Sequence, residues 1–163
     1  DFIKAADIVI SKNPKTEFII LGSPDNSSPD TIPFSWLEKI NDKKGFFWFS
    51  HKEDVNDFLK KIDVFCLPTY YPEGLPKSLL EAAVMRLPLI TTDTPGCREI
   101  VKNNINGFLI KIKNPKQLAD KMYNLSIDKK LRKRMGDESF KIVSEQFSID
   151  IVIKKTLKVY NLT

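Results

Sequence analysis

The chain has 163 residues, of which 42% are apolar and 29% charged, and its formal net charge is +5. A chain of this length and balance can bury one full core, which excludes a disordered or fibrous protein. No apolar stretch reaches the roughly 18 residues of a membrane span, and the first residues lack a secretory pattern.

Short apolar runs alternate with helical patterns, which predicts an α/β fold: a parallel, Rossmann-like sheet with helices on both faces. The predicted strands run from Phe18 to Leu21, Phe46 to Phe49, Val64 to Leu67, Leu89 to Thr92 and Phe108 to Ile110. The predicted helices run from Asp1 to Ser11, Phe34 to Asn41, Asp54 to Lys61, Pro76 to Arg86, Cys97 to Lys102, Pro115 to Leu125, Lys129 to Gln146 and Ile149 to Asn161. Without an internal repeat, residues 1–163 are expected to form one domain.

In such sheets, ligands bind beyond the carboxyl ends of the strands. Four loops are predicted to begin there, at Gly22, Ser50, Pro68 and Asp93. The loop after the second strand and the loop after the third are therefore expected to converge on one edge of the sheet.

Two cysteines, Cys66 and Cys97, have neither the spacing of a zinc site nor the number of a disulfide framework. A reducing cytoplasm is the simplest setting that this pattern predicts.

The dense basic cluster of the chain spans residues 129–134. It is interpreted as a solvated helix face or, alternatively, as a surface attracted to anionic lipid headgroups. A nucleic-acid site is not expected, because no aromatic residue interleaves the cluster and no binding motif accompanies it.

The segment 73–81 carries the most specific chemistry. Pro76 has the φ angle of a first helical residue and pushes Leu75 into an extended conformation, so a helix is predicted to begin at Pro76. Gly74 allows close approach of a ligand. The free N–H groups of Lys77, Ser78 and the next residue would favour an anion at the positive end of the helix.

Glu73 lies before this helix and Glu81 lies within it, in an apolar run. A buried carboxylate needs partners, and ribose hydroxyls would be suitable donors. Alternatively, Glu81 pairs with a distant cation, Glu73 is a solvated loop acid and Pro76 starts an ordinary helix. A glycosidase would need two carboxyls roughly 5–10 Å apart. Eight residues of helix span about 12 Å, which better fits contacts to two ends of one long ligand.

The stretch from Leu67 to Thr92 contains this E-x7-E pair, and it continues through the D-T-P-G-C-R-E-I-V run that starts at Asp93 and the N-G-F-L run that starts at Asn106. On these residues the chain resembles the retaining glycosyltransferases of group 1, which have the GT-B fold. The resemblance covers essentially the whole chain. The T-D-x-P-G-C-R-E sequence is most similar to that of enzymes that build bacterial capsule, O-antigen and glycan chains on polyprenyl-diphosphate carriers.

The resemblance implies a role for each residue of the segment. It assigns the ribose hydroxyls to Glu81 and the donor-sugar hydroxyls to Glu73, as the catalytic residue. It places the donor sugar beside the backbone of residues 74–76, namely Gly74, Leu75 and Pro76, and the diphosphate near Lys77 and Ser78. It also assigns the loop that cups the base to Ser50, His51 and Lys52. Ser50 replaces the usual Gly there, and Leu87 is taken to stand where Gly is usual before Pro88.

The family holds the donor diphosphate with an Arg and a Lys after a first strand, and neither is found here. The opening residues resemble the helix that follows this loop. The chain is therefore interpreted as the C-terminal, donor-binding lobe of a longer enzyme, without its first strand and its N-terminal acceptor lobe. The closing helix would cross to that lobe, so its apolar stripe from Ile149 to Tyr160 is expected to be partly exposed or paired with a second copy.

The resemblance implies metal-independent transfer from a nucleoside-diphosphate sugar, with UDP favoured as the nucleotide, to a glycan or lipid-linked acceptor. No cofactor is expected. The location would be cytoplasmic, with a possible peripheral contact to an anionic membrane. A nucleotide-binding module without transfer activity and a nucleotide-sugar 2-epimerase-like enzyme are the alternatives. The isolated chain is expected to transfer no sugar.

Overall fold

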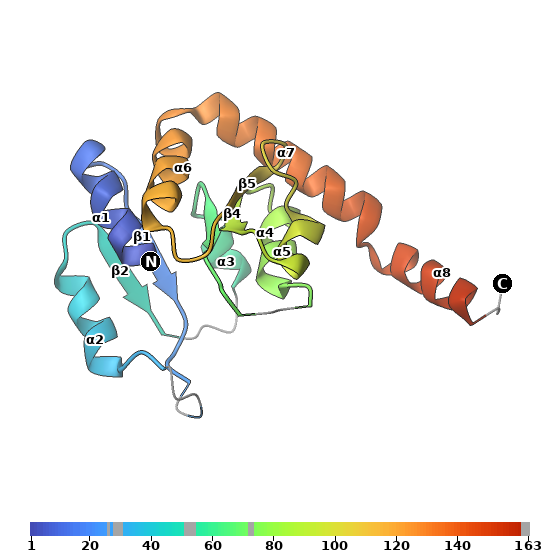
Figure 1. Cartoon of the computed structure of the whole chain (residues 1–163), viewed down its shortest axis with the longest axis horizontal. Coiled ribbons are helices and arrows are strands. Elements are labelled where there is room, and N and C mark those ends of the chain that lie inside the picture. Colours follow the sequence, from blue (N-terminus) through green and yellow to red (C-terminus); the bar gives the residue numbers. More distant parts are fainter. Residues whose placement is uncertain (26, 28–30, 51–54, 72–73, 161–163) are drawn as a thin grey trace.

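The computed structural model describes residues 1–25, 27, 31–50, 55–71 and 74–160. Helices and strands alternate along the chain, as Figure 1 shows. The order is α1 (Phe2–Lys12), β1 (Phe18–Leu21), α2 (Phe34–Glu38), a 3-10 helix (Lys39–Asp42), β2 (Phe46–Phe49), α3 (Asn56–Leu59), β3 (Phe65–Leu67), α4 (Lys77–Val84), β4 (Leu89–Thr92), α5 (Pro95–Ile100), β5 (Gly107–Ile110), α6 (Pro115–Ile127), α7 (Lys129–Gln146) and α8 (Ile149–Val159). The α/β class is confirmed.

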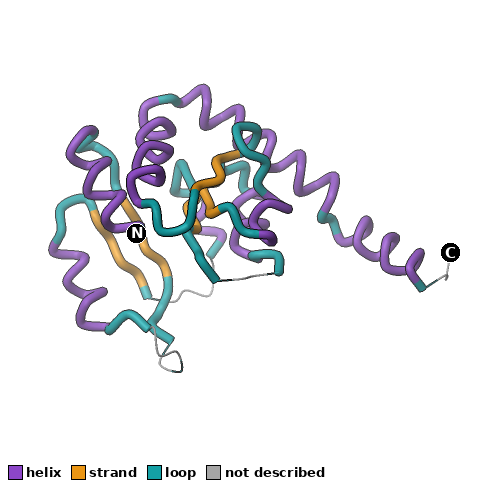
Figure 2. Tube along the Cα trace, viewed as in Figure 1, coloured by secondary structure: helices purple, strands orange, loops and turns teal. Residues whose placement is uncertain are grey.

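All the strand pairs are parallel, and the strands lie where the apolar runs predicted them to within one residue. They form two sheets, β1-β2 and β3-β4-β5, and no ladder joins the two within the described residues. In register, Phe18 lies opposite Phe46, and Leu89 lies between Phe65 and Gly107. Figure 2 shows the two groups of strands side by side.

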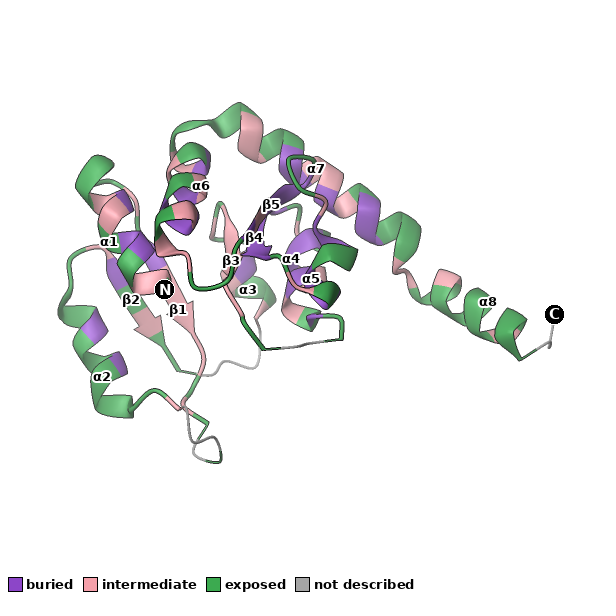
Figure 3. Cartoon of the chain, in the orientation of Figure 1, coloured by how far each residue is buried: buried purple, intermediate pink, exposed green. Residues whose placement is uncertain are grey.

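Helices cover both faces of β4. Successive side chains of a strand point to opposite sides, so neighbouring residues of β4 pack in different clusters. Ile90 packs in the cluster that holds Leu118 of α6, whereas Leu89 packs in the cluster that holds Leu79 of α4. All four residues of β4 are buried. Figure 3 shows that the buried residues concentrate on β4, β5 and the inner sides of the surrounding helices.

Several predicted helix boundaries were wrong by a few residues. The helix expected from Phe34 to Asn41 ends as an α-helix at Glu38 and continues as the 3-10 helix, and α3 is shorter than predicted at both ends. The helix expected at Cys97 begins at Pro95 instead, whereas α6 begins at Pro115 as predicted, so both of these prolines lie in the first turn. There the missing N–H costs nothing. The prediction for α7 is confirmed at both ends.

The exit from α4 differs from the expectation for Leu87. The residue with the left-handed backbone is Arg86, with φ 58°, and Leu87 is buried instead. The position where the fold would favour glycine is therefore one residue earlier than predicted. Helix α7 crosses closely here: a Cβ on Gly136 would lie 2.0 Å from the Arg86 carbonyl oxygen.

Helix α8 projects from the body of the molecule and has no buried residue (Figure 1). Ser148 is its N-cap residue, as predicted, although no capping hydrogen bond from its side chain is present within the described residues. Ile149 is 74% exposed and Ile153 is 50% exposed, which confirms that part of the apolar stripe is uncovered. Over the described residues, no helix is both long and apolar enough to cross a membrane.

Candidate functional site

Helix α4 begins one residue later than predicted, because Pro76 is its N-cap and not its first helical residue. Pro76 has the φ of a helical residue, −61°, but its ψ of 112° is that of an extended residue, so it lies outside the helix. Its carbonyl oxygen accepts from the N–H groups of Leu79 and Leu80, at 3.1 and 3.3 Å. The Leu79 N–H is therefore not free to bind an anion, contrary to the expectation, which leaves Lys77 and Ser78 as the residues whose N–H groups open the helix.

Glu81 lies on a half-open side of α4 rather than in the core. It lines a hollow of about 310 Å³ together with Lys77, one turn earlier, and Val84, which is 49% exposed. The expectation that Glu81 is buried was wrong, because within the described residues no helix packs fully over the face of α4 formed by residues 77, 80, 81 and 84. Within the described residues, Glu81 forms no ion pair, so the alternative of a distant cationic partner is not supported.

Three residues that the sequence did not single out complete this hollow. Asn56 comes from the start of α3, and Val143 and Phe147 come from the last turn of α7 and the residue that follows it. They are far from Glu81 in sequence, and no motif marks them. Only the fold brings a polar side chain and two apolar ones opposite the Lys77 and Glu81 pair.

The remaining predicted site residues fall into two groups. Ser50 directly follows β2 and is exposed, and Gly74 and Leu75 are exposed before α4. Nothing lies within 4 Å of a Cβ built on Gly74, so the chain itself does not require glycine there. Glu73, His51 and Lys52 lie outside the described residues, and their roles stay predictions.

Two buried threonines hold the loop that leads to the candidate site. The Thr91 hydroxyl donates to the Leu67 carbonyl oxygen at 2.8 Å, and the Thr92 hydroxyl donates to the Thr69 carbonyl oxygen. A hydroxyl carries one proton, so Cys97 Sγ, 3.1 Å from Thr91 Oγ1, can complete the contact with its own S–H. The end of β4 therefore fixes the first residues after β3.

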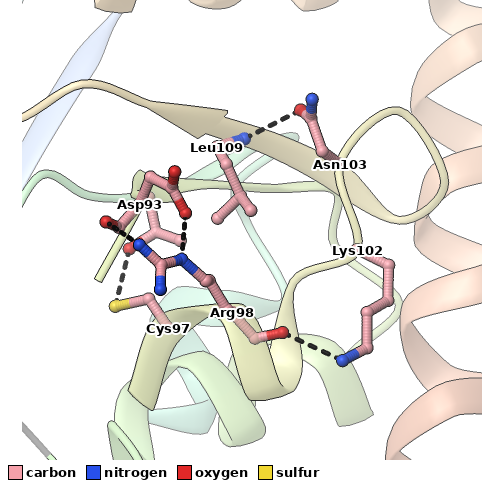
Figure 4. Close-up of polar contacts among 7 residues, drawn as sticks. Asp93, Cys97, Arg98, Lys102, Asn103 and Leu109 are labelled. Carbon is pink, nitrogen blue, oxygen red and sulfur yellow. Dashed lines mark hydrogen bonds and ion pairs between the residues drawn. The ribbon is translucent and has the colours of Figure 1, made fainter. Parts of the chain in front are cut away.

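The D-T-P-G-C-R-E motif closes the loop after β4 upon itself, as Figure 4 shows. The Arg98 guanidinium donates to the side chain of Asp93 and, at 3.1 Å, to its backbone carbonyl oxygen. Lys102 Nζ donates to the Arg98 carbonyl oxygen at 2.9 Å, and Asn103 Oδ1 accepts from the Leu109 N–H at 3.1 Å. These contacts give Asp93 and Arg98 a structural role.

A second hollow, of about 440 Å³, lies beside the loop after β3. Asp1, Phe2, Pro68, Tyr70 and Lys113 line it. Tyr70 stacks on Tyr71 with ring centroids 4.7 Å apart, and Lys113 Nζ lies 5.6 Å from the Tyr70 ring centroid. Aromatic and cationic groups thus flank the stretch that leads to residue 73.

Neither cysteine offers reactive chemistry near these hollows. Burial raises the pKa of the Cys66 thiol well above its usual range, so the thiol stays protonated at neutral pH. Cys97 is fully buried against Thr91, and both cysteines are free. Over the described residues, no group of three or more His, Cys, Asp or Glu side chains has the arrangement of a metal site.

The chain belongs to the glycosyl transferases group 1 family, whose sequence profile matches residues 1–142. The match covers α1 to α6, most of α7 and the residues that line the candidate site, except Val143 and Phe147. The parallel fold and the family membership therefore point to the same class of protein, a group 1 glycosyltransferase.

Individual relatives agree with this class. The UDP-Gal:alpha-D-GlcNAc-diphosphoundecaprenol alpha-1,3-galactosyltransferase of Escherichia coli is 31% identical over 80% of this chain and 33% of its own length. The capsular polysaccharide biosynthesis glycosyltransferase CapM of Staphylococcus aureus is 27% identical over 99% of this chain and 42% of its own length. The chain thus spans about a third to two fifths of the length of the curated relatives it matches.

A solved structure shares the fold. The C-terminal domain of the group 1 family glycosyl transferase LpcC from Francisella tularensis superposes with a TM-score of 0.77 at 24% identity. The match covers 91% of this chain and 78% of that domain. The fold described above is therefore that of a C-terminal glycosyltransferase domain.

Proposed function

We propose that this chain forms the lobe of a group 1 glycosyltransferase that binds a nucleoside-diphosphate sugar, with UDP as the nucleotide. The longer enzyme would transfer the sugar, with retention of anomeric configuration, to a glycan or polyprenyl-diphosphate-linked acceptor. The observation that carries this proposal is the hollow in which Glu81 and Lys77 face Asn56. The Glu81 carboxylate has no cationic partner among the described residues, so it can accept hydrogen bonds from ribose hydroxyls. Lys77, one turn earlier at the start of the helix, can attract the diphosphate.

The start of α4 would stabilise the leaving diphosphate. The helix N-terminus carries a partial positive charge, and the Lys77 side chain adds a full one beside it. Negative charge that develops on the leaving oxygen is stabilised most by donors that are already in place. Glu73, just before this helix, is proposed to bind the hydroxyls of the donor sugar, without a resident metal or cofactor.

The split sheet supports the proposal that a further strand belongs to this lobe. Among the described residues, β1 pairs only with β2 and β3 only with β4, although Phe18 of β1 and Cys66 of β3 pack in one core. We propose that a preceding strand pairs with both. Hydrogen exchange of a longer chain should then show β1 and β3 amides protected more strongly than here; equal exchange would contradict this.

The names of the relatives support the proposed chemical classes of donor and acceptor, and do not identify the particular sugar or glycan. The name of the Escherichia coli relative contains both a UDP-sugar and a diphosphoundecaprenol acceptor. We propose the same classes here. The two free cysteines suit a reducing cytoplasm, and a peripheral contact with an anionic membrane belongs to the same proposal because a lipid-linked acceptor would be anchored there.

Calorimetric titration with UDP tests the role of Glu81. Glu81→Gln removes the charged acceptor for the ribose hydroxyls and should weaken UDP binding by about tenfold to a hundredfold. Its melting temperature should stay unchanged, because Glu81 is only half-buried. Glu99→Gln, an exposed glutamate on α5, is the matched control. Wild-type affinity in a stably folded Glu81→Gln variant would end the ribose assignment.

The same titration separates the two glutamates. Glu73→Ala should leave the affinity for UDP unchanged but lower the affinity for a UDP-sugar. In the longer enzyme it should reduce kcat/KM, since the contact of Glu73 with the sugar strengthens as the anomeric carbon gains positive charge. GDP and ADP titrations test the base. The isolated chain should form no product from UDP-sugars and polyprenyl-diphosphate glycans. Turnover by this chain alone would contradict its assignment as one lobe of the enzyme.

A further inference from the structure

A surface corner forms where α1 ends beside the junction of α6 and α7. Asn13, just after α1, donates from Nδ2 to Ser126 Oγ at 3.2 Å, and Lys12 Nζ lies 5.5 Å from the centroid of the Tyr123 ring on α6. Asp128 separates α6 from α7 and caps α7 by accepting from the Leu131 N–H at 2.9 Å. Residues far apart in sequence are therefore fixed side by side.

Exposed cations cover this corner, and one exposed apolar side chain lies among them. Ile127, the last residue of α6, is 58% exposed. The exposed cations are Lys12, Lys15, Lys129, Lys130, Lys133 and Arg134, and with Ile127 they define the basic corner. The acids within four residues of these cations are Glu17, Asp128, Asp137 and Glu138. The Asp128 carboxylate accepts the capping bond, and the Asp137 carboxylate pairs with Lys133. Six cations against four acids leave the basic corner net positive.

The stability of the fold does not account for the cations at the start of α7. The first turn of α7 contains no acidic residue, and Lys129 and Lys130 instead place positive charge at the positive end of the helix dipole. Lys130 and Arg134 are four residues apart, a spacing at which like charges repel. Within the described residues, Lys129, Lys130 and Arg134 form no ion pair. Lys129 and Lys130 therefore cost helix stability, and Arg134 adds a like-charge repulsion with Lys130.

Unlike these three residues, the neighbouring cations form contacts that stabilise the fold. Arg132 donates to the carbonyl oxygens of Leu125 and Ser126 and pairs with Asp63. Lys133 pairs with Asp137 at 2.8 Å, and Lys12 lies in the last turn of α1, where a cation is favourable. On α7, Lys129, Lys130 and Arg134 have no such role in the described part of the chain and need another explanation.

We propose that the basic corner docks on the surface of a lipid bilayer that carries anionic headgroups. Each basic residue near such a surface contributes about 1 kcal/mol, and Ile127 can enter the headgroup region. Nucleic acid fits less well, because Tyr123 is half-buried under Lys12 and no exposed aromatic ring of the corner offers a stacking surface. The choice of a bilayer also rests on the proposed lipid-linked acceptor.

Docking there would leave the candidate site open. Val143 and Phe147 line the hollow near the end of α7, whereas the basic corner lies at its start. Eighteen residues of helix separate Lys129 from Phe147, which is about 27 Å at 1.5 Å per residue. Membrane binding and nucleotide binding should therefore be measurable independently.

Vesicle sedimentation tests the proposal. The chain is mixed with vesicles of phosphatidylcholine alone, or of equal parts phosphatidylcholine and phosphatidylglycerol, at low and at high salt. Wild type should bind the anionic vesicles at low salt and leave them at high salt. A variant with Lys129→Gln, Lys130→Gln and Arg134→Gln should bind about a hundredfold more weakly. Its melting temperature should be equal or higher, because Lys129 and Lys130 oppose the helix dipole and Lys130 repels Arg134.

A second variant removes the same charge from α8, by Lys154→Gln, Lys155→Gln and Lys158→Gln. It should keep wild-type vesicle binding. An equal loss in both variants, or wild-type binding to neutral vesicles, would overturn the proposal, as would tighter binding of wild type to RNA than to anionic vesicles. UDP affinity should be the same in wild type and the first variant. A wild type that binds anionic vesicles but not UDP would refute the proposed function alone.

Discussion

The two groups of strands differ in how fully they are packed, and the difference explains where the candidate site lies. β4 has a parallel neighbour on each side and is buried along its whole length. In the part of the chain that the structure describes, β2 pairs only with β1, and its Phe47 remains 40% exposed. Helix α4, with Lys77 and Glu81, packs on the three-stranded group. The candidate site is thus built on the better-packed half, and a site that fixes ligand groups in place benefits from such rigid support.

The largest expected effect tests the packing of that half at Gly136. Gly136→Ala places a Cβ 2.0 Å from the Arg86 carbonyl oxygen, and both belong to backbone that cannot move aside cheaply. We expect a loss of about 3 kcal/mol in the free energy of unfolding, measured by denaturant titration. Gly74→Ala is the matched control, since its Cβ meets nothing within 4 Å, and it should change stability by less than about 0.5 kcal/mol. Equal effects would show that α7 does not pack tightly against the end of α4.

The second prediction makes the same chemical change in each half. Thr91→Val removes a buried hydroxyl that donates to the Leu67 carbonyl oxygen, so it should cost about 2 kcal/mol. Thr16→Val, just before β1, removes a buried hydroxyl that has no hydrogen-bond partner within the described residues, and it should be neutral or stabilising by about 1 kcal/mol. Melting curves of both variants give the comparison. Two changes of the same sign would contradict the assigned partners.

The strands were predictable because each is a short, continuous apolar run between breakers, and that pattern does not depend on distant residues. The prolines show the limit. Pro95 and Pro115 begin helices as the fixed φ angle suggests, whereas Pro76 adopts ψ 112° and only caps α4. Proline fixes φ but leaves ψ to its surroundings. Sequence therefore located the helix starts to within a residue or two and could not decide which N–H groups stay free.

The candidate site was predictable as a motif but not as a shape. The spacing of Glu73 and Glu81 indicated one ligand, yet Glu81 was expected to be buried because its neighbours in sequence are apolar. Burial depends on what packs over α4, and the open side left by α3 and α7 is a property of the whole fold. Asn56 and Phe147 reach the hollow through that same packing, which no local pattern reveals.

The smallest expected effect tests the strained exit of α4. Arg86 has φ 58°, a conformation that costs an L-residue about 1 kcal/mol and costs glycine little. Its side chain offsets part of this cost, because the guanidinium lies 4.1 Å from the Phe140 ring centroid and pairs with Asp137 at 3.1 Å. Both partners are on α7. The ion pair is exposed and contributes little, so most of the compensation comes from the cation–π contact, which is worth about 1 kcal/mol.

Arg86→Gly should therefore leave stability within about 0.5 kcal/mol of wild type, because relief of strain offsets the lost contacts. Arg86→Ala loses the same contacts and keeps the strain, so it should be less stable than Arg86→Gly by about 1 kcal/mol. Denaturant titration of the two variants measures the strain directly, since the lost contacts cancel in the difference. Equal stability would mean that the exit of α4 relaxes when the arginine is removed. In that case the contacts of Arg86 with α7, and not the packing of the helix end, impose the left-handed backbone.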